Sequence, residues 1–304
     1  MKLKPWIEAM RLRTLPVSVA GVIAGTACAI YHHGFSVVPM LICLAFAIIA
    51  QIVSNFANEY YDFKNGLDKK GREGYRRGVT EGDISPRAMR NATFGLLIAD
   101  SLLGCSLIWW GGWWLVPVGM AIAVFALAYS TGPYPLSHHG LGDVAVVIFF
   151  GFVPVIFTEY VQTGIFNLDY VTLCSALAVG LLAANVLIVN NYRDYEDDKA
   201  VGKNTTVVIF GRKTMARVYL INDIVAYFCL AIATVNAPVW TVAAWICLLQ
   251  QSSIPLWRKL KTLKGTALNN VLKRTSMALL FSTICLLIIL CVWKQGEFKY
   301  HSLL

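Results

Sequence analysis

Long apolar runs recur along this whole chain, and each is about as long as a bilayer is thick. A helix needs about twenty consecutive apolar residues to cross the hydrocarbon core of a membrane. Hydrophobic residues make up 57% of the chain and charged residues 14%, which excludes an ordinary soluble domain, where roughly a quarter are charged. Because unpaired backbone groups are not tolerated in lipid, the runs must be helices. We therefore expect an all-α membrane protein.

The runs predict nine transmembrane helices in a single domain that covers residues 1–304. The predicted spans are Thr14–His32, Val37–Asn58, Met89–Trp110, Trp113–Ser130, Val144–Tyr160, Tyr170–Val189, Val218–Val235, Val239–Leu256 and Ser276–Val292.

The basic residues predict which ends of these spans face the cytoplasm. Nearly all Lys and Arg lie in the N-terminal segment and in the segments that follow the even-numbered spans. The opposite connections HHGFS, WGG, VQTGIFNL and NAP contain neither residue. This asymmetry predicts a cytoplasmic N-terminus and an outer C-terminus. The same loops explain the net charge of +9, because basic loops attract anionic lipid. The charge therefore does not require a nucleic-acid partner. No obligatory protein partner is evident from the sequence.

A polar pattern occurs twice, each time at the cytoplasmic end of an even-numbered span. Both copies have Asn or Asp at three positions and then Gly, spaced by three, four and four residues. The first copy is Asn55, Asn58, Asp62 and Gly66, and the second is Asn191, Asp194, Asp198 and Gly202, a shift of 136. In an α-helix these offsets place the polar groups in one stripe. The repeat predicts an internal duplication, with motifs at 55–68 and 191–204 and a binding site between the two copies.

A solvated helix end is the alternative explanation of each motif. It would explain the glycines as C-terminal caps, but carboxylates near a helix C-terminus oppose the helix dipole. Acidic clusters at a membrane interface need cations. Mg²⁺ takes a few carboxylate oxygens and shares phosphate oxygens with a substrate, so two facing motifs could hold two ions and clamp one diphosphate. Arg193, Lys203 and the run Arg76–Gly78 would neutralise its remaining charge. A polyprenyl diphosphate has this anionic head and an apolar tail.

Four motifs together make the chain similar to a known family. They are RLRTLP at Arg11–Pro16, NxxxD at Asn58–Asp62 with GLD at Gly66–Asp68, YSTGPYPLSHHGLGD at Tyr129–Asp143, and NNYRDYEDDKAVGKNT at Asn190–Thr205. With them the chain resembles the UbiA superfamily of membrane-embedded aromatic prenyltransferases, and within it the 1,4-dihydroxy-2-naphthoate polyprenyltransferases of menaquinone biosynthesis. It departs from that branch at Glu59, which often is Asp, and at His138–His139, which replace a more usual aromatic pair. Gly66 fills a slot where many relatives outside this branch have a third acid.

The resemblance implies about nine helices around a central cavity, with Asp62 and Asp194 facing each other across it. It also implies transfer of a polyprenyl group from its diphosphate to 1,4-dihydroxy-2-naphthoate, with loss of CO2 and diphosphate, to give demethylmenaquinol. The enzyme would lie in the cytoplasmic membrane of a bacterium, with its active site on the cytoplasmic face and a lateral opening for the isoprenoid tail.

The implied site residues fall into three groups. The metal ligands for two Mg²⁺ ions are Asn58, Asp62, Asp68, Asp194 and Asp198. The residues expected to act in catalysis are Asp62, Asp194, Asp198 and Lys203. The expected substrate contacts are Asn55, Asn191, Arg193, Tyr129 and Tyr134, with Arg13 for the carboxylate of the acceptor.

Two alternatives stay open at this point. The acceptor could be another that UbiA-type enzymes use, such as 4-hydroxybenzoate, homogentisate or haem. An ion-coupled transporter would also have many spans and an internal repeat, but its ion sites usually lie near the membrane midplane. Asp100, inside the third predicted span, lies too deep to join the metal cluster, so we expect it to make a buried hydrogen bond.

Overall fold

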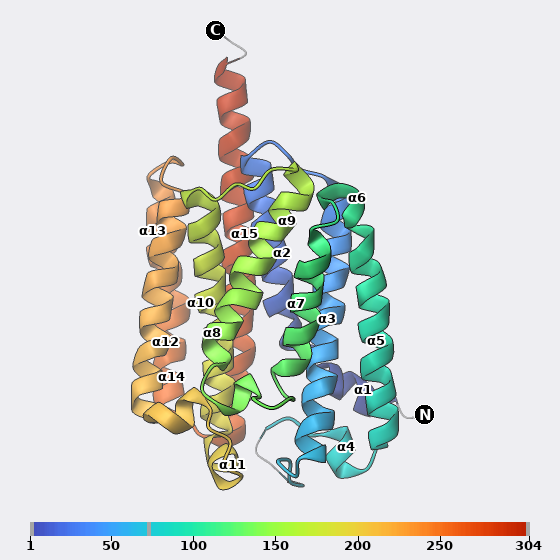
Figure 1. The fold of residues 1–304 in the computed structure, drawn as a ribbon. Coiled ribbons are helices and arrows are strands. Elements are labelled where there is room, and N and C mark those ends of the chain that lie inside the picture. Colours follow the sequence, from blue (N-terminus) through green and yellow to red (C-terminus); the bar gives the residue numbers. More distant parts are fainter. Residues whose placement is uncertain (1–2, 72–73, 302–304) are drawn as a thin grey trace.

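The computed structural model describes residues 3–71 and 74–301, and within these ranges it is a helical bundle without a β-strand. The long helices are α2 (Leu15–Tyr31), α3 (Val37–Lys64), α5 (Pro86–Ser106), α7 (Leu115–Ala128), α10 (Tyr170–Arg193), α12 (Thr206–Ala233) and α15 (Leu268–His301). Figure 1 shows them standing side by side along one common direction.

Two further segments of the bundle are each interrupted by a π-helical turn. One contains α8 (Gly142–Val146), η2 (Val147–Phe152) and α9 (Val153–Thr163), and the other contains α13 (Trp240–Leu248), η3 (Leu249–Ser253) and α14 (Ile254–Thr262). In both segments a proline, Pro154 or Pro255, is the second residue after the turn, where its missing N–H cannot bond to the preceding turn. The short elements are α1 (Leu3–Met10), α4 (Gly78–Glu81), α6 (Ile108–Gly111), η1 (Leu136–His138), α11 (Tyr195–Ala200) and η4 (Gly265–Ala267).

The predicted all-α membrane class is confirmed. Within the described residues six helices are long and apolar enough to cross a membrane, and α1 with α2, bent by 50°, would make a seventh. The other two predicted spans coincide with α7, which has 14 residues, and with the interrupted segment of α13 and α14. The count of nine spans stays a prediction.

Helix α10 is the centre of the bundle. Of its most apolar window 72% is buried, against 11% for the span that contains α5, which faces outward. It packs against α12, α15, α2 and η2. Gly151 and Gly180 let η2 approach α10, since a Cβ at either position would lie within 2.7 Å of a backbone oxygen of the other segment.

Both acidic motifs reach the same end of the bundle. In Figure 1, α4, which follows the first motif, and α11, which lies within the second, are at the end that also carries α1. The last turns of α15 project from the opposite end. The motifs therefore come from separate halves of the chain but lie at the same end of the bundle.

Candidate active site

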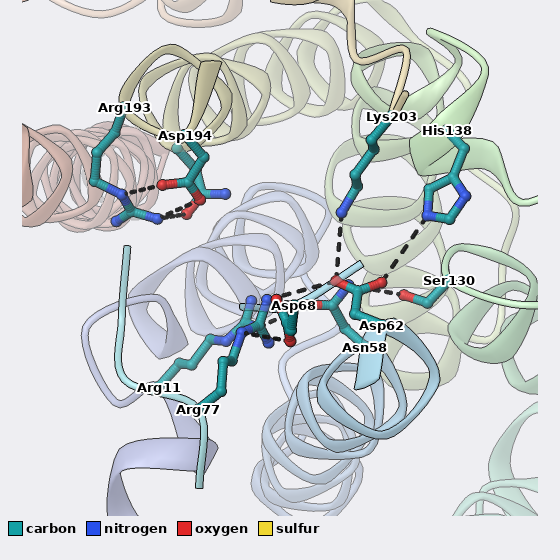
Figure 2. A network of polar contacts seen from close by, with 11 residues as sticks. Arg11, Asn58, Asp62, Asp68, Arg77, Ser130, His138, Arg193, Asp194 and Lys203 are labelled. Carbon is teal, nitrogen blue, oxygen red and sulfur yellow. Dashed lines mark hydrogen bonds and ion pairs between the residues drawn. The ribbon is translucent and has the colours of Figure 1, made fainter. Parts of the chain in front are cut away.

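The first acidic motif is organised around the side chain of Asn58, buried near the C-terminal end of α3. Its Oδ1 atom accepts hydrogen bonds from Arg11 Nη2 at 2.6 Å and Arg77 Nη2 at 3.0 Å. Its Nδ2 atom donates to Asp62 Oδ2 and to Ser130 Oγ, both at 3.1 Å. Asn58 thus connects two guanidinium groups to the carboxylate one helical turn further along, as Figure 2 shows.

Three basic side chains surround Asp62, and each comes from a different connection. Lys203 Nζ lies 3.4 Å and Arg77 Nη2 3.6 Å from Oδ2, and His138 Nε2 lies 3.9 Å from Oδ1. Arg77 Nε also lies 3.4 Å from Asp68 Oδ2. Lys203 belongs to the second motif, so this ion pair joins the two copies of the repeat. The side chain of Asp62 is only 2% exposed.

The second motif has a different local structure. Helix α10 ends at Arg193, Asp194 occupies its C-cap, and Asp198 lies on the separate helix α11. The predicted single stripe on one helix is therefore wrong for this copy. Asp194 is held by its neighbour: Arg193 Nε donates to Oδ1 at 2.6 Å and Nη2 donates to Oδ2 at 2.8 Å.

Arg193 is fixed by further contacts. Its remaining donors reach Asn190 Oδ1 and Asn269 Oδ1, each at 2.9 Å. Because its side chain is 2% exposed and four of its five N–H donors reach protein groups, Arg193 holds Asp194 in place. Figure 2 shows this pair on the opposite side of the site from Asp62.

The two motifs border one cavity of about 130 Å³. Its wall includes seven of the residues that the sequence assigned to the site: Asn55, Asn58, Tyr129, Asn191, Asp194, Asp198 and Lys203. Arg193 also lines it, beside Asp194. Asp62 and Asp68 lie behind the wall and touch it through Asn58 and Arg77.

Two assigned residues lie outside this cavity. Arg13 is exposed, and its guanidinium carbon sits 5.5 Å from the ring centroid of Tyr75. Tyr134 is 55% exposed and stacks on His139 with 3.6 Å between ring centroids. Arg11 lies inside the cavity wall instead of Arg13, because Arg11 takes a left-handed backbone conformation, φ 51°, in the turn between α1 and α2. We correct both assignments accordingly.

A second, apolar cavity of about 290 Å³ adjoins the first between α2, α3, α5, α7 and α9. Gln51, Ser54, Phe125 and Phe150 line both. Its wall also contains Cys105 on α5 and Met120 on α7, which are exposed on the outer surface of the bundle. The polar site therefore continues into an apolar space that reaches the lipid-facing side.

Comparison with known proteins places this arrangement in a family. The model of the UbiA prenyltransferase family matches residues 18–282. The chain belongs to the UbiA prenyltransferase family. It is 36% identical to the 1,4-dihydroxy-2-naphthoate octaprenyltransferase of Haemophilus influenzae over 79% of this chain and 80% of that one. It is 34% identical to the enzyme of that name from Mycobacterium tuberculosis over 90% and 92%.

Solved UbiA structures have the same fold at low sequence identity. A UbiA homolog from Archaeoglobus fulgidus gives a TM-score of 0.65 at 14% identity, covering 94% of this chain and all of that one. The structure of a UbiA homolog from the same organism bound to DMAPP and Mg²⁺ gives 0.61 at 14% identity, covering 91% and 99%. UbiA neighbours are thus known with a prenyl diphosphate and a metal ion.

The donor set of this UbiA chain fits a hard cation that shares its ligands with a substrate. The acidic side chains and amides offer oxygen ligands, and Asp62 Oδ1 is buried without a hydrogen-bond partner in the described part of the chain. Among the described residues no three or more Asp, Glu, His or Cys side chains form a ready-made metal cluster. Mg²⁺ is commonly held by one or two carboxylates together with water and substrate phosphates, so the site needs no complete protein cage.

Three residues of the site were not assigned by the sequence. Arg11 and Ser130 lie in the motifs RLRTLP and YSTGPY, but their side-chain directions depend on the turns that carry them. His138 was noticed only as a departure from the family pattern, and it approaches Asp62. The signal for each was its position in a shared motif.

Proposed function

We propose that this protein transfers a polyprenyl group from a polyprenyl diphosphate to 1,4-dihydroxy-2-naphthoate, with loss of CO2 and diphosphate, and forms demethylmenaquinol. The names of its relatives support the acceptor. The observation that carries the proposal is the pair of adjoining cavities, one polar and bordered by both acidic motifs, the other apolar and open toward lipid. The basic loops support a bacterial cytoplasmic membrane with this face inside.

The diphosphate belongs at the polar end. Asn58, Asp62 and Asp68 on one side and Asp194 and Asp198 on the other would hold two Mg²⁺ ions. When bound, the ions supply charge neutralisation to the leaving diphosphate. Lys203 lines the same cavity and lies 3.4 Å from Asp62. Its ammonium group stabilises the leaving group more as the negative charge develops, which lowers the barrier.

The acceptor carboxylate belongs beside Arg11 and Arg77. Both guanidinium groups line the cavity and converge on Asn58 Oδ1. A guanidinium group binds a carboxylate through two parallel hydrogen bonds. Arg11 therefore takes over the role that the sequence suggested for Arg13.

The isoprenoid tail belongs in the apolar cavity. Its volume of about 290 Å³ is at the lower end of the range for small-ligand pockets, so a long tail fits only in part. The rest would leave between α5 and α7, past Cys105 and Met120. Phe125 and Phe150 stand where the two cavities join, and aromatic faces there favour an allylic cation and keep water from it.

These placements bring the reacting atoms to the junction of the cavities. The bond between the allylic carbon and the diphosphate oxygen breaks, and diphosphate keeps the electron pair. The ring carbon that bears the carboxylate forms the new carbon–carbon bond. Loss of CO2 then breaks the bond between the ring carbon and the carboxylate carbon. The electron pair of that bond stays in the ring and restores the aromatic quinol.

An acceptor panel tests the proposal. Purified protein in liposomes is given Mg²⁺, radiolabelled geranyl diphosphate and one of four acceptors: 1,4-dihydroxy-2-naphthoate, 4-hydroxybenzoate, homogentisate or haem. We expect labelled lipid product with the naphthoate only, with one CO2 released per product. Consumption of another acceptor in its place would assign the protein to a different UbiA activity. Consumption of none, in protein that retains its fold, would refute prenyl transfer.

A further inference from the structure

Asp100 carries a buried carboxyl oxygen that has no hydrogen-bond partner within the part of the chain that the structure describes. It lies on α5, inside the membrane-spanning segment Pro86–Gly111, and is 3% exposed. Its Oδ1 atom is buried and has no hydrogen-bond partner among the described residues. The buried hydrogen bond that the sequence led us to expect is absent there. An unsatisfied buried polar group costs about 1–3 kcal/mol, so a ligand that pairs with it would recover this cost.

The side chain faces a space that could hold such a ligand. Asp100 lines the apolar cavity, which shares wall residues with the active-site cavity and also has Cys105 and Met120, both exposed on the surface of the bundle, in its wall. A largely apolar pocket with a few polar groups is the usual form of a site for an amphiphilic small molecule. Asp100 therefore stands on the path from the active site to the lipid.

A second intramembrane carboxyl group also has a buried oxygen, Asp223 Oδ2, without a hydrogen-bond partner among the described residues, but it does not border either cavity. Asp223 lies on α12 in the other half of the chain and is 2% exposed. Its Oδ1 atom accepts a hydrogen bond from Asn185 Nδ2 at 2.9 Å, and it lines neither of the two cavities. It is a matched control, with the same side chain buried in the same kind of span.

The chemistry of the reaction, if the proposed function holds, selects one occupant for this position. The isoprenoid tail has no polar atom to offer. The diphosphate and the naphthoate carboxylate are anions, and bringing either beside a second carboxyl group in an apolar space is unfavourable. The prenylated product has lost both charges and keeps two ring hydroxyl groups, which lose their hydrogen bonds when the ring enters an apolar cavity.

We propose that Asp100 binds a ring hydroxyl of the prenylated product on its way to the membrane. The carboxyl group supplies one hydrogen bond to the neutral dihydroxy aromatic head, while the tail lies ahead of it between α5 and α7. The site favours the product over the anionic acceptor, so it directs release toward lipid. Diphosphate leaves separately, toward the charged end of the bundle.

Product inhibition tests this site. The probe is demethylmenaquinol with a geranyl tail, kept reduced and added to the liposome assay with geranyl diphosphate and the naphthoate. We expect Asp100→Leu to raise the inhibition constant of the product about two- to tenfold, the worth of one hydrogen bond. The KM values of both substrates should stay within about twofold. Asp100→Asn, which can still form a hydrogen bond, should retain most of the affinity, and Asp223→Asn should retain all of it.

Thermal unfolding separates binding from structural damage. Because Asp100 Oδ1 has no hydrogen-bond partner among the described residues, Asp100→Leu should unfold at the wild-type temperature or above it. An unchanged inhibition constant in Asp100→Leu, or an equal rise in Asp223→Asn, would overturn the inference. Failure of Asp100→Leu to fold would also overturn it, because it would show a structural role. A wild-type protein that makes no prenylated naphthoate would refute the proposed function, and this inference with it.

Discussion

In the first acidic motif α3 continues past Asp62 to Lys64, whereas in the second α10 stops at Arg193 and Asp198 lies on α11. Both copies nevertheless end in the same turn. Leu67 N donates to Asp62 O at 2.8 Å, and Lys203 N donates to Asp198 O at 2.9 Å. Gly66 and Gly202 take left-handed conformations, φ 69° and 71°. This six-residue cap is the Schellman motif, and it lies 136 residues apart in the two copies, as the sequence repeat does.

The copies differ most in the origin of their positive charges. Asp62 is paired with basic side chains from three distant connections, one of which belongs to the other copy. Asp194 is paired with the residue that precedes it. The first motif is therefore held together across the site and the second motif locally. This difference predicts that charge changes at the first motif affect catalysis, while loss of the local partner of the second affects the fold.

The largest effect on stability is expected from Arg193→Met. Removing one partner of a buried ion pair leaves an uncompensated charge and costs about 3–5 kcal/mol. Thermal unfolding in detergent should show a large drop. Arg212→Met is the control, because its partner Glu196 is 66% exposed and such a pair is worth at most about 1 kcal/mol. Equal shifts in the two variants would mean that the second motif is not held locally.

The next largest effect is expected on turnover when a metal-binding carboxylate is neutralised, and it should be similar for both motifs. Asp62→Asn, Asp194→Asn and Asp198→Asn keep shape but remove charge, so each should lose at least about a hundredfold in turnover with Mg²⁺. Excess chelator should abolish turnover in the wild type. Glu196→Gln, on the same short helix as Asp198 but exposed, should leave the rate unchanged. Full activity in any of the three aspartate variants would remove that residue from the metal site.

Lys203 tests whether turnover depends on the ion pair between the two motifs or only on the general basic charge of the surface. Lys203→Ala should slow turnover by roughly thirtyfold, equivalent to about 2 kcal/mol for a hydrogen bond to a charged group. Lys199→Ala, in the same segment but exposed, should change the rate little. Rates measured at saturating naphthoate will show the difference. A similar loss in both variants would reduce Lys203 to a member of a general basic surface.

Arg11 should have the smallest effect, and it should act on one substrate. Arg11→Ala should raise the KM for the naphthoate roughly tenfold with less change in kcat, because carboxylate recognition is uniform binding. An acceptor without the carboxylate should be much less affected. Arg13→Ala provides the control, since Arg13 is exposed and outside the cavity wall. Equal sensitivity of both acceptors would exclude Arg11 from the carboxylate site.

The sequence could predict the helices, the repeat and its glycine caps, because periodicity and residue type determine them locally. It could not predict the break at Asp194, since spacings of three and four residues fit a continuous helix and a broken one equally. It could not choose between Arg11 and Arg13, because a positive φ at one residue decides which side chain enters the cavity. That Asp100 Oδ1 finds no hydrogen-bond partner among the described residues depends on the packing of α3, α5, α7 and α9, which no local pattern records.

The central claim is that the two motifs clamp one diphosphate, and a double-mutant cycle tests it most directly. The affinity of an unreactive prenyl diphosphate analogue is measured with Mg²⁺ for wild type, Asp62→Asn, Asp194→Asn and the double variant. Residues that share one ligand show coupling energies of about 0.5–3 kcal/mol. We predict that the double variant loses clearly less affinity than the sum of the two single losses. Losses that add within about 0.3–0.5 kcal/mol would show two independent sites and contradict the account.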